Sequence, residues 1–430
     1  MQHLTFNDNR VYNISILHYV TAAIVFFFIS VLIPFNSLHF IGHYFHPKVL
    51  AITHLTTIGW ISIIIIGSLY QLVPVITNSK LYSVKLGYIS YCLIMLGLFV
   101  LTYSFWNFNV GLLIQIASVL VFLGVCFLFF NLYLTINSAK EKSIELDFIG
   151  VSLLWFWLTV FLGTLLAFNF RYAFLNKDHL YFLKIHAHVG LLGWFLNLVF
   201  GVASKLVPMF LLSGKLNNKI IKLSFYVLNV SLFVFVIDSV FFNGLQRSYF
   251  YLSVVIIAVI MFGTYIYQAF KTRLKKQLDV GLLQTLIAFI LILIPIVLWC
   301  LLKFKTYKSS DVEMQLNIAL VYSILLGFFT ILIFGQTYKN LSFISWLKIY
   351  SNYPTTIKKP MPKDLYSNKL AKTQLSIYLF AFIILLYGIL TSTSYIIKFG
   401  GVLIICCALL YLANVFKIVF HKPIIYKTIN

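Results

Sequence analysis

The sequence predicts an all-α integral membrane protein with about twelve transmembrane helices, arranged in three four-helix repeats related by pseudo-threefold symmetry. The first indication is composition, because 61% of the residues are hydrophobic, only 10% are charged and the mean hydropathy is +0.98. The second is a series of apolar stretches long enough to cross a bilayer. The third is an internal repeat with a period of 134 residues.

Twelve apolar stretches reach spanning length, and helices are expected because backbone polar groups in lipid must be satisfied within the segment. Grouped in fours they give repeats at about 11–136, 148–269 and 280–420, within one transmembrane domain covering 1–430. The expected spans are Val11–Pro34, Val49–Ile76, Val84–Tyr103, Val110–Ile136, Phe148–Ala167, Leu183–Leu212, Ile220–Phe242, Tyr249–Ala269, Val280–Leu302, Met314–Tyr338, Leu375–Leu390 and Tyr395–Phe420.

The repeat is clearest in the second helix of each group. HLTTIGWISIIIIGSLYQLVP begins at His54 and HVGLLGWFLNLVFGVASKLVP begins at His188. Both share Gly-Trp, a second Gly and a Leu-Val-Pro ending, which we interpret as a helix stop. A further step of 134 residues reaches Tyr322, with Gly327, Phe328 and Gly335 in register. Tyr322 is either a redox-active phenol or a packed side chain, and packing is the more common role.

The net charge of +22 would favour nucleic acid binding in a soluble protein, but here it is expected to set topology. Lys and Arg are concentrated in the N-terminus, the even-numbered loops and the C-terminus, which predicts that both termini are cytoplasmic. The basic segment 339–372 is expected to be a cytoplasmic loop facing anionic lipid headgroups of the bilayer. The first apolar stretch is long and lacks a cleavage site, so it is expected to be an anchor. The five cysteines form no CxxC motif, which argues against structural zinc and c-type haem.

Seven of the ten histidines are expected near the non-cytoplasmic face. His54, His186 and His188 are placed in the first turns of the second and sixth helices, and His179 in an outer loop. The run HFIGHYFHPK adds three outer-loop imidazoles that could bind copper: His39, His43 and His46. A lone membrane histidine more often caps a helix, but equivalent positions in two repeats favour a functional role.

Two further patterns concern direction and charge. His186 and His188 are about 200° apart on a helix, so they are expected to serve different sites. Asp238 lies near an outer helix end, where a proton-handling role and simple ion pairing both remain open. Arg171 and Arg247 could hold acidic groups such as haem propionates, or could anchor helix ends at the interface.

The segment HAHVGLLGWFLNLVFGVASKLVP resembles the tenth helix of haem-copper oxidase subunit I, most closely in C-type cytochrome oxidases and nitric oxide reductases. HLTTIGW from His54 is similar to the second helix of that family. The resemblance implies twelve helices in three arcs, with His54 and His188 as axial ligands of one haem b and His186 as ligand of a second iron. It also implies a bacterial inner membrane, a respiratory electron-transfer role, a quinol or cytochrome electron donor and a partner subunit.

The sequence departs from the family in two ways. The HxH pair lies on the sixth helix instead of the tenth, and the seventh helix has no histidine to bind the usual active-site copper. Three interpretations therefore stay open. The first is a bis-histidine haem protein that transfers electrons. The second is an oxygen or nitric oxide reductase with an unusual distal site that uses His186 and His18 or the outer-loop histidines. The third is a non-redox metal sensor or transporter that binds copper.

Overall fold

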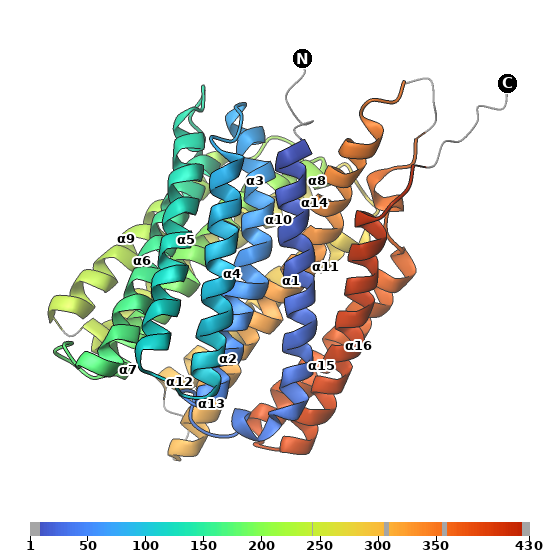
Figure 1. The fold of residues 1–430 in the computed structure, drawn as a ribbon. Coiled ribbons are helices and arrows are strands. Elements are labelled where there is room, and N and C mark those ends of the chain that lie inside the picture. Colours follow the sequence, from blue (N-terminus) through green and yellow to red (C-terminus); the bar gives the residue numbers. More distant parts are fainter. Residues whose placement is uncertain (1–8, 243, 305–308, 355–358, 424–430) are drawn as a thin grey trace. The chain divides into compact units, whose positions relative to one another are not determined.

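The computed structural model describes residues 9–242, 244–304, 309–354 and 359–423 (Figure 1). Regular structure in this part of the chain is helical, apart from an isolated β-bridge between Ser213 and Arg273. Twelve of the described helices are long and apolar enough to cross a membrane. The chain is therefore a multi-pass membrane protein, and the predicted all-α fold class with twelve spans is confirmed.

Each repeat contributes four spans, of which the second is divided into an α-helix, a π-helical segment and a further α-helix. The first repeat contains α1 (Asn9–Phe35), α2 (Pro47–His54), η2 (Leu55–Ser62), α3 (Ile63–Thr77), α4 (Val84–Trp106) and α5 (Leu112–Asn137). The second contains α6 (Ile144–Tyr172), α7 (His179–His188), η3 (Val189–Leu196), α8 (Asn197–Leu211), α9 (Asn218–Phe242) and α10 (Ser248–Lys271). The third contains α11 (Val280–Leu291), α12 (Leu293–Lys303), α13 (Ser310–Tyr322), η5 (Ser323–Phe329), α14 (Thr330–Tyr350), α15 (Asn368–Leu390) and α16 (Ser394–Val419). Short 3-10 turns are η1 (Ser37–Phe40), η4 (Gly244–Arg247) and η6 (Pro362–Asp364).

The chain divides into two compact units. Unit 1 contains Met1–Leu72, Phe105–Asn107 and Leu278–Asn430, and unit 2 contains Val73–Ser104 and Phe108–Gln277. Unit 1 thus contains the first span and most of the second span of the first repeat, together with the third repeat. Unit 2 joins most of α4 and all of α5 to the second repeat. The organisation of 1–430 as a single domain remains a prediction.

Several helix ends lie beyond the expected bounds. The tenth span runs through Ser310–Tyr350, and α15 begins at Asn368. Residues 339–350 at the start of the expected loop 339–372 are therefore helical, as are residues 368–372 at its end. The sixth span begins at His179, which is not a loop residue as expected, and His186 and His188 lie beyond the first turn of α7. His54 likewise ends α2. The sequence-based bounds were too short because hydropathy detects only the apolar part of a helix, whereas polar ends continue the same hydrogen-bond ladder.

The expected Leu-Val-Pro helix stops are also wrong in detail. Both helices continue for one more turn after the proline, to Thr77 and to Leu211. The helices then end in the same way, with Asn78 and Leu212 in the left-handed conformation at φ 51° and 53°. The next amide donates to the proline carbonyl, at 3.1 Å from Ser79 and 3.0 Å from Ser213. Proline is tolerated here because it loses only one ladder bond near a helix end.

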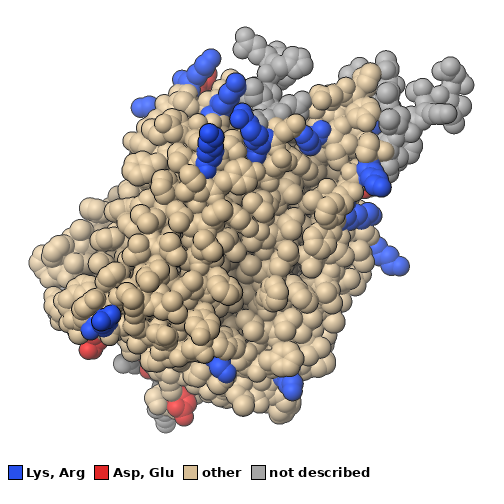
Figure 2. All heavy atoms as spheres, viewed as in Figure 1, with Lys and Arg blue, Asp and Glu red and all other residues tan. Residues whose placement is uncertain are grey.

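The surface matches a protein surrounded by lipid. In Figure 2 the visible face is mostly uncharged, and Lys and Arg gather near the helix ends. The repeated second glycine marks the close contact between the first two spans of each repeat. An added Cβ would lie 2.6 Å from the His18 Cβ at Gly67, 2.3 Å from the Phe148 Cβ at Gly201 and 2.4 Å from the Gly281 carbonyl oxygen at Gly335. Small residues allow such helix approach in membranes, where packing replaces the hydrophobic effect.

Candidate haem-ligand site

The three residues that head the sequence repeat occupy the same structural position. His54, His188 and Tyr322, here called the signature residues, each end an α-helix and immediately precede a π-helical segment. π-Helical turns are rare and occur often at functional sites. Residues separated by the 134-residue offset are thus equivalent in backbone structure as well as in sequence.

The signature ring of each repeat lies against a phenylalanine of that repeat's third span. His54 stacks on Phe105 with ring centroids 4.8 Å apart. The equivalent pairs are His188 with Phe235 at 5.3 Å and Tyr322 with Phe382 at 5.3 Å. Each signature ring therefore has a phenylalanine neighbour from the same span of its repeat, stacked for His54 and Tyr322 and tilted by 44° for His188.

A second aromatic pair also recurs. Trp60 packs on Phe26, Trp194 stacks on Phe156 and Phe328 lies beside Phe289, with centroid distances of 4.7, 4.3 and 6.4 Å. In every case the phenylalanine comes from the first span of the repeat. These pairs hold the π-helical segment in place, so the Gly-Trp motif has a packing role.

The two signature histidines share one hydrogen-bond pattern. Nδ1 lies 2.8 Å from the Leu50 carbonyl oxygen in His54 and 2.7 Å from the Lys184 carbonyl oxygen in His188. A carbonyl only accepts, so Nδ1 carries the proton and donates. The lone pair is then on Nε2. Metal-binding histidines characteristically have this arrangement, because the second nitrogen fixes the tautomer and the ring orientation. His54 and His188 are therefore suited to bind iron through Nε2.

His186 has the same tautomer but a different neighbour. Its Nδ1 donates to the Thr159 carbonyl oxygen of α6 at 2.9 Å, and its Cε1 lies 3.0 Å from where a Cβ on Gly163 would be. His188 instead contacts Phe235 of α9. The two rings are thus directed to different helices of unit 2, as the helical spacing predicts.

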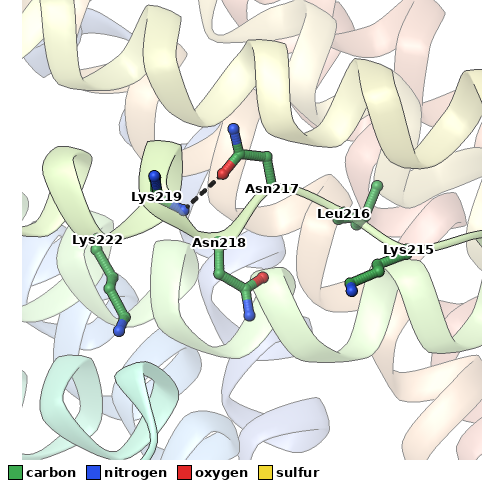
Figure 3. A pocket seen from close by; sticks show the side chains of 6 residues that line it. All are labelled: Lys215, Leu216, Asn217, Asn218, Lys219 and Lys222. Carbon is green, nitrogen blue, oxygen red and sulfur yellow. Dashed lines mark hydrogen bonds between the residues drawn. The ribbon is translucent and has the colours of Figure 1, made fainter.

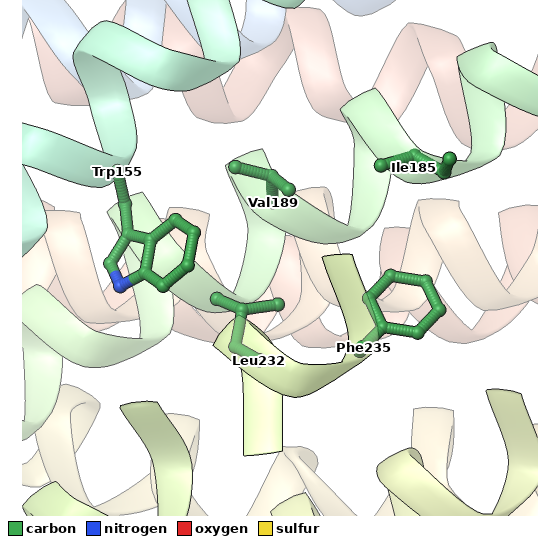
Figure 4. Packing of buried hydrophobic residues seen from close by; sticks show 5 residues of the cluster. All are labelled: Trp155, Ile185, Val189, Leu232 and Phe235. Carbon is green, nitrogen blue, oxygen red and sulfur yellow. The ribbon is translucent and has the colours of Figure 1, made fainter. Parts of the chain in front are cut away.

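Apolar side chains fix the turn that carries both histidines. Ile185 and Val189, which flank the pair, pack with Trp155 of α6 and with Leu232 and Phe235 of α9 (Figure 4). A narrow hollow beside His188 is lined by residues of α9 and α10, including Ser231 and Tyr251. Its volume of about 10 Å³ is far below the usual size of a ligand pocket, so we assign no porphyrin to that side of the ring.

Similarity to known proteins is found among solved structures. No family model and no curated protein matches the sequence. Among solved structures, the chain is similar to a chain of a heme-copper terminal oxidase dimer, determined by cryo-EM. The TM-score is 0.68 at 10% sequence identity, covering 97% of this chain and 85% of the oxidase chain. This chain has the haem-copper oxidase fold. The fold resemblance predicted from the HxH segment is confirmed.

The three outer-loop histidines do not form one ligand set. Within the described residues, no group of three or more His, Cys, Asp or Glu side chains is placed to hold a metal. His39 stacks on His46 at 4.2 Å, and His43 stacks on Tyr44 at 4.3 Å. The Nδ1 atoms of His43 and His46 accept from the backbone amides of Phe45 and Lys48. Their rings therefore carry the proton on Nε2, the opposite tautomer to that of the signature histidines.

The other candidate residues have local roles in the structure. His18 donates from Nδ1 to the Ile14 carbonyl oxygen at 2.7 Å and packs edge-on against Tyr70. The Tyr322 hydroxyl lies 3.4 Å from the Phe382 carbonyl oxygen, to which it donates. Both side chains are buried. These contacts support packing, the more common of the two roles weighed for Tyr322.

Arg247 has an acidic partner within unit 2. Its Nε donates to Asp238 Oδ2 at 2.8 Å, its Nη2 bonds Asp238 Oδ1, and Tyr251 donates to Oδ2 at 2.9 Å. Gly244 is needed here, because an added Cβ would lie 2.5 Å from Oδ2. The bidentate fork therefore binds a carboxylate of the chain itself, so Asp238 takes part in an ion pair. Arg171 lies over the Tyr172 ring and is exposed.

The sequence analysis did not predict a series of side-chain hydrogen bonds that links α6, α8 and α9. Trp155 Nε1 donates to Asn229 Oδ1 at 2.9 Å, and Asn229 donates to Asn197 Oδ1 at 2.9 Å. Asn197 in turn donates to Ser152 Oγ at 2.9 Å. Such bonds tie membrane helices together. The sequence feature that could have indicated this network is Asn197, because a polar side chain inside an apolar membrane span needs a hydrogen-bond partner.

Proposed function

We propose that this chain is an integral-membrane b-type haem protein of respiratory electron transfer, in which His54 and His188 would hold the haem iron. The observation that carries the proposal is the shared Nδ1–carbonyl bond of the two signature histidines, which leaves the Nε2 lone pair of each ring as the atom that would bind iron. The haem-copper oxidase fold supports it. A bis-histidine haem supplies one-electron transfer and leaves no open position on iron.

The roles of the chain's own residues follow from their contacts. Leu50 and Lys184 hold the tautomer through their carbonyl oxygens, and Phe105 and Phe235 each cover one face of a ligand ring. Burial by these apolar neighbours would tune the reduction potential, since a low-dielectric surrounding disfavours the charged state of iron. We further propose a quinol or a cytochrome as electron donor and both termini on the cytoplasmic side.

The test is an absorption spectrum of the purified full-length protein. We expect a Soret band and resolved α and β bands after reduction. His54→Ala and His188→Ala should each abolish the low-spin spectrum, whereas Tyr322→Phe, the matched change at the third signature position, should retain it. A colourless wild-type protein, or a normal spectrum in both histidine variants, would contradict the assignment.

A second function is favoured by one observation, the separate direction of His186 toward Thr159 of α6. A haem held by His186 alone would keep an open position, as an oxygen or nitric oxide reductase requires. Carbon monoxide should then shift the reduced spectrum of the wild type but not that of His186→Ala. No shift in the wild type would leave electron transfer as the function. Copper binding by the outer loop, the third interpretation, lacks the ligand geometry described above.

A further inference from the structure

The turn between α8 and α9 carries a basic hollow that the proposed haem function does not use. It is lined by Lys215, Leu216, Asn217, Asn218, Lys219 and Lys222 (Figure 3). All three lysines are exposed. Lys219 and Lys222 lie in the first turn and a half of α9, three residues apart, so they are neighbours on the helix surface. Lys215, Asn218 and Lys222 extend to the same side of the turn in Figure 3.

A second basic segment is fastened to this turn by backbone hydrogen bonds. The amides of Leu274 and Lys275 donate to the carbonyl oxygens of Leu212 and Leu211, each at 3.2 Å. The Gly214 amide donates to the Thr272 carbonyl oxygen at 3.3 Å. The end of α10 and the bonded segment that follows it add further cations, namely Lys271, Arg273, Lys275 and Lys276. Neither segment, 211–222 or 269–278, contains Asp or Glu. All charged side chains of these two ranges are therefore positive.

Large apolar side chains are exposed at the same place. Leu212 is 58% exposed and Leu274 is 79% exposed, and their backbones are hydrogen-bonded to each other. Exposed leucines beside lysines match an amphiphile, since an acyl chain covers the former and a phosphate pairs with the latter. Free phosphate would use only the lysines. The leucines therefore decide between a lipid and a free anion as the ligand.

We propose that the α8–α9 turn, together with the segment after α10, is a binding site for one anionic phospholipid. The headgroup phosphate lies in the hollow between Lys215 and Lys222, with the Asn218 amide as a further donor. The acyl chains lie against Leu212 and Leu274. Lys271 and Lys276, exposed on the adjoining segment, add to the attraction for the anionic leaflet.

Native mass spectrometry of the full-length protein in detergent tests the site, with phosphatidylglycerol and phosphatidylcholine as probes. The wild type should retain phosphatidylglycerol in preference to phosphatidylcholine. The triple variant Lys215→Gln, Lys219→Gln, Lys222→Gln should bind phosphatidylglycerol at least about tenfold more weakly, because three cations that would pair with the headgroup phosphate are removed. The matched control is Lys80→Gln, Lys85→Gln, Lys140→Gln, which removes the same charge from other exposed positions of unit 2 and should behave as wild type.

Two further arms separate the sources of phosphate. The double variant Leu212→Ser, Leu274→Ser should weaken phosphatidylglycerol binding but leave binding of soluble glycerophosphoglycerol unchanged. Millimolar inorganic phosphate should not displace the lipid. Equal lipid retention by the lysine triple variant and its control would overturn the site. Displacement by inorganic phosphate, with no effect of the leucine changes, would overturn the lipid assignment. Lys222→Gln alone provides the same test if the triple variant does not fold, and the haem spectrum should be unchanged in all these variants.

Discussion

At the residue scale, the protonated nitrogen separates two kinds of histidine in this chain. His18, His54, His186 and His188 donate from Nδ1 to carbonyl oxygens, whereas His43 and His46 accept at Nδ1 from amides. The first kind presents Nε2 as a ligand atom and the second presents Nε2 as a donor. The distinction favours iron ligands within the spans and a structural role for the outer loop.

His186→Ala should leave the low-spin spectrum intact, while His188→Ala should abolish it. The physical reason is that the two rings contact different helices, so only one of them belongs to the bis-histidine site. Optical spectra of the two purified variants check this. Equal loss of the low-spin bands in both would mean that the two side chains serve one site.

The stacked pair His39 and His46 makes the outer loop sensitive to acid. Partial burial lowers the pKa of His39 below its usual 6.5, with His46 and Lys48 adding charge repulsion. Burial and Lys48 likewise lower the pKa of His46. The unfolded loop thus binds protons more readily than the folded loop, so stability falls as pH falls from 6.5 through the lowered values. Hydrogen exchange of residues 36–46, corrected for the intrinsic rate, should rise on acidification.

The double variant His39→Gln, His46→Gln is the control for this effect. Glutamine does not titrate, so its exchange at residues 36–46 should stay flat over the same pH range. A wild-type loop with no change in exchange between about pH 7.5 and pH 5 would show that the stack does not couple to loop stability.

At the element scale, the second glycine of each repeat sets the distance between two spans. Gly201→Ala should destabilise the protein by about 1–3 kcal/mol, because the new Cβ would lie 2.3 Å from the Phe148 Cβ. Gly263 in α10 is the matched control, since an added Cβ there meets nothing within 4 Å. Gly263→Ala should be stabilising by about 0.5–1 kcal/mol through helix propensity. Thermal unfolding in detergent compares the two, and a Gly201→Ala variant as stable as Gly263→Ala would contradict the close-contact role.

At the scale of the whole molecule, the distribution of Lys and Arg predicts which side each loop faces. A fluorescent reporter that folds only in the cytoplasm should be active when fused after Asn430 or inserted at Asn217, and inactive when inserted at Gly42. A periplasmic phosphatase reporter should give the reverse pattern. These positions lie in segments that the positive-inside rule assigns to opposite faces. Activity of the cytoplasmic reporter at Gly42 would contradict the predicted topology.

The pseudo-threefold relation gives a second prediction at this scale. In an experimental structure, the three repeats should superpose by rotations of about 120° with His54, His188 and Tyr322 at equivalent positions. If His54 and His188 face different cavities in that structure, the proposed bis-histidine site is wrong, whatever the spectrum shows.

The sequence by itself determined the fold class, the twelve spans and the equivalence of His54, His188 and Tyr322, because hydropathy and a 134-residue period are properties of the chain alone. It also placed His186 and His188 on different sides of one helix, which follows from helical geometry. Only tertiary structure decided what those positions contact. The partners Phe105 and Phe235, the Thr159 carbonyl oxygen and the pairing of Arg247 with Asp238 join different elements of the fold, so no local pattern encodes them. The same holds for helix ends such as Tyr350, where polar residues continue a helix that hydropathy cannot detect.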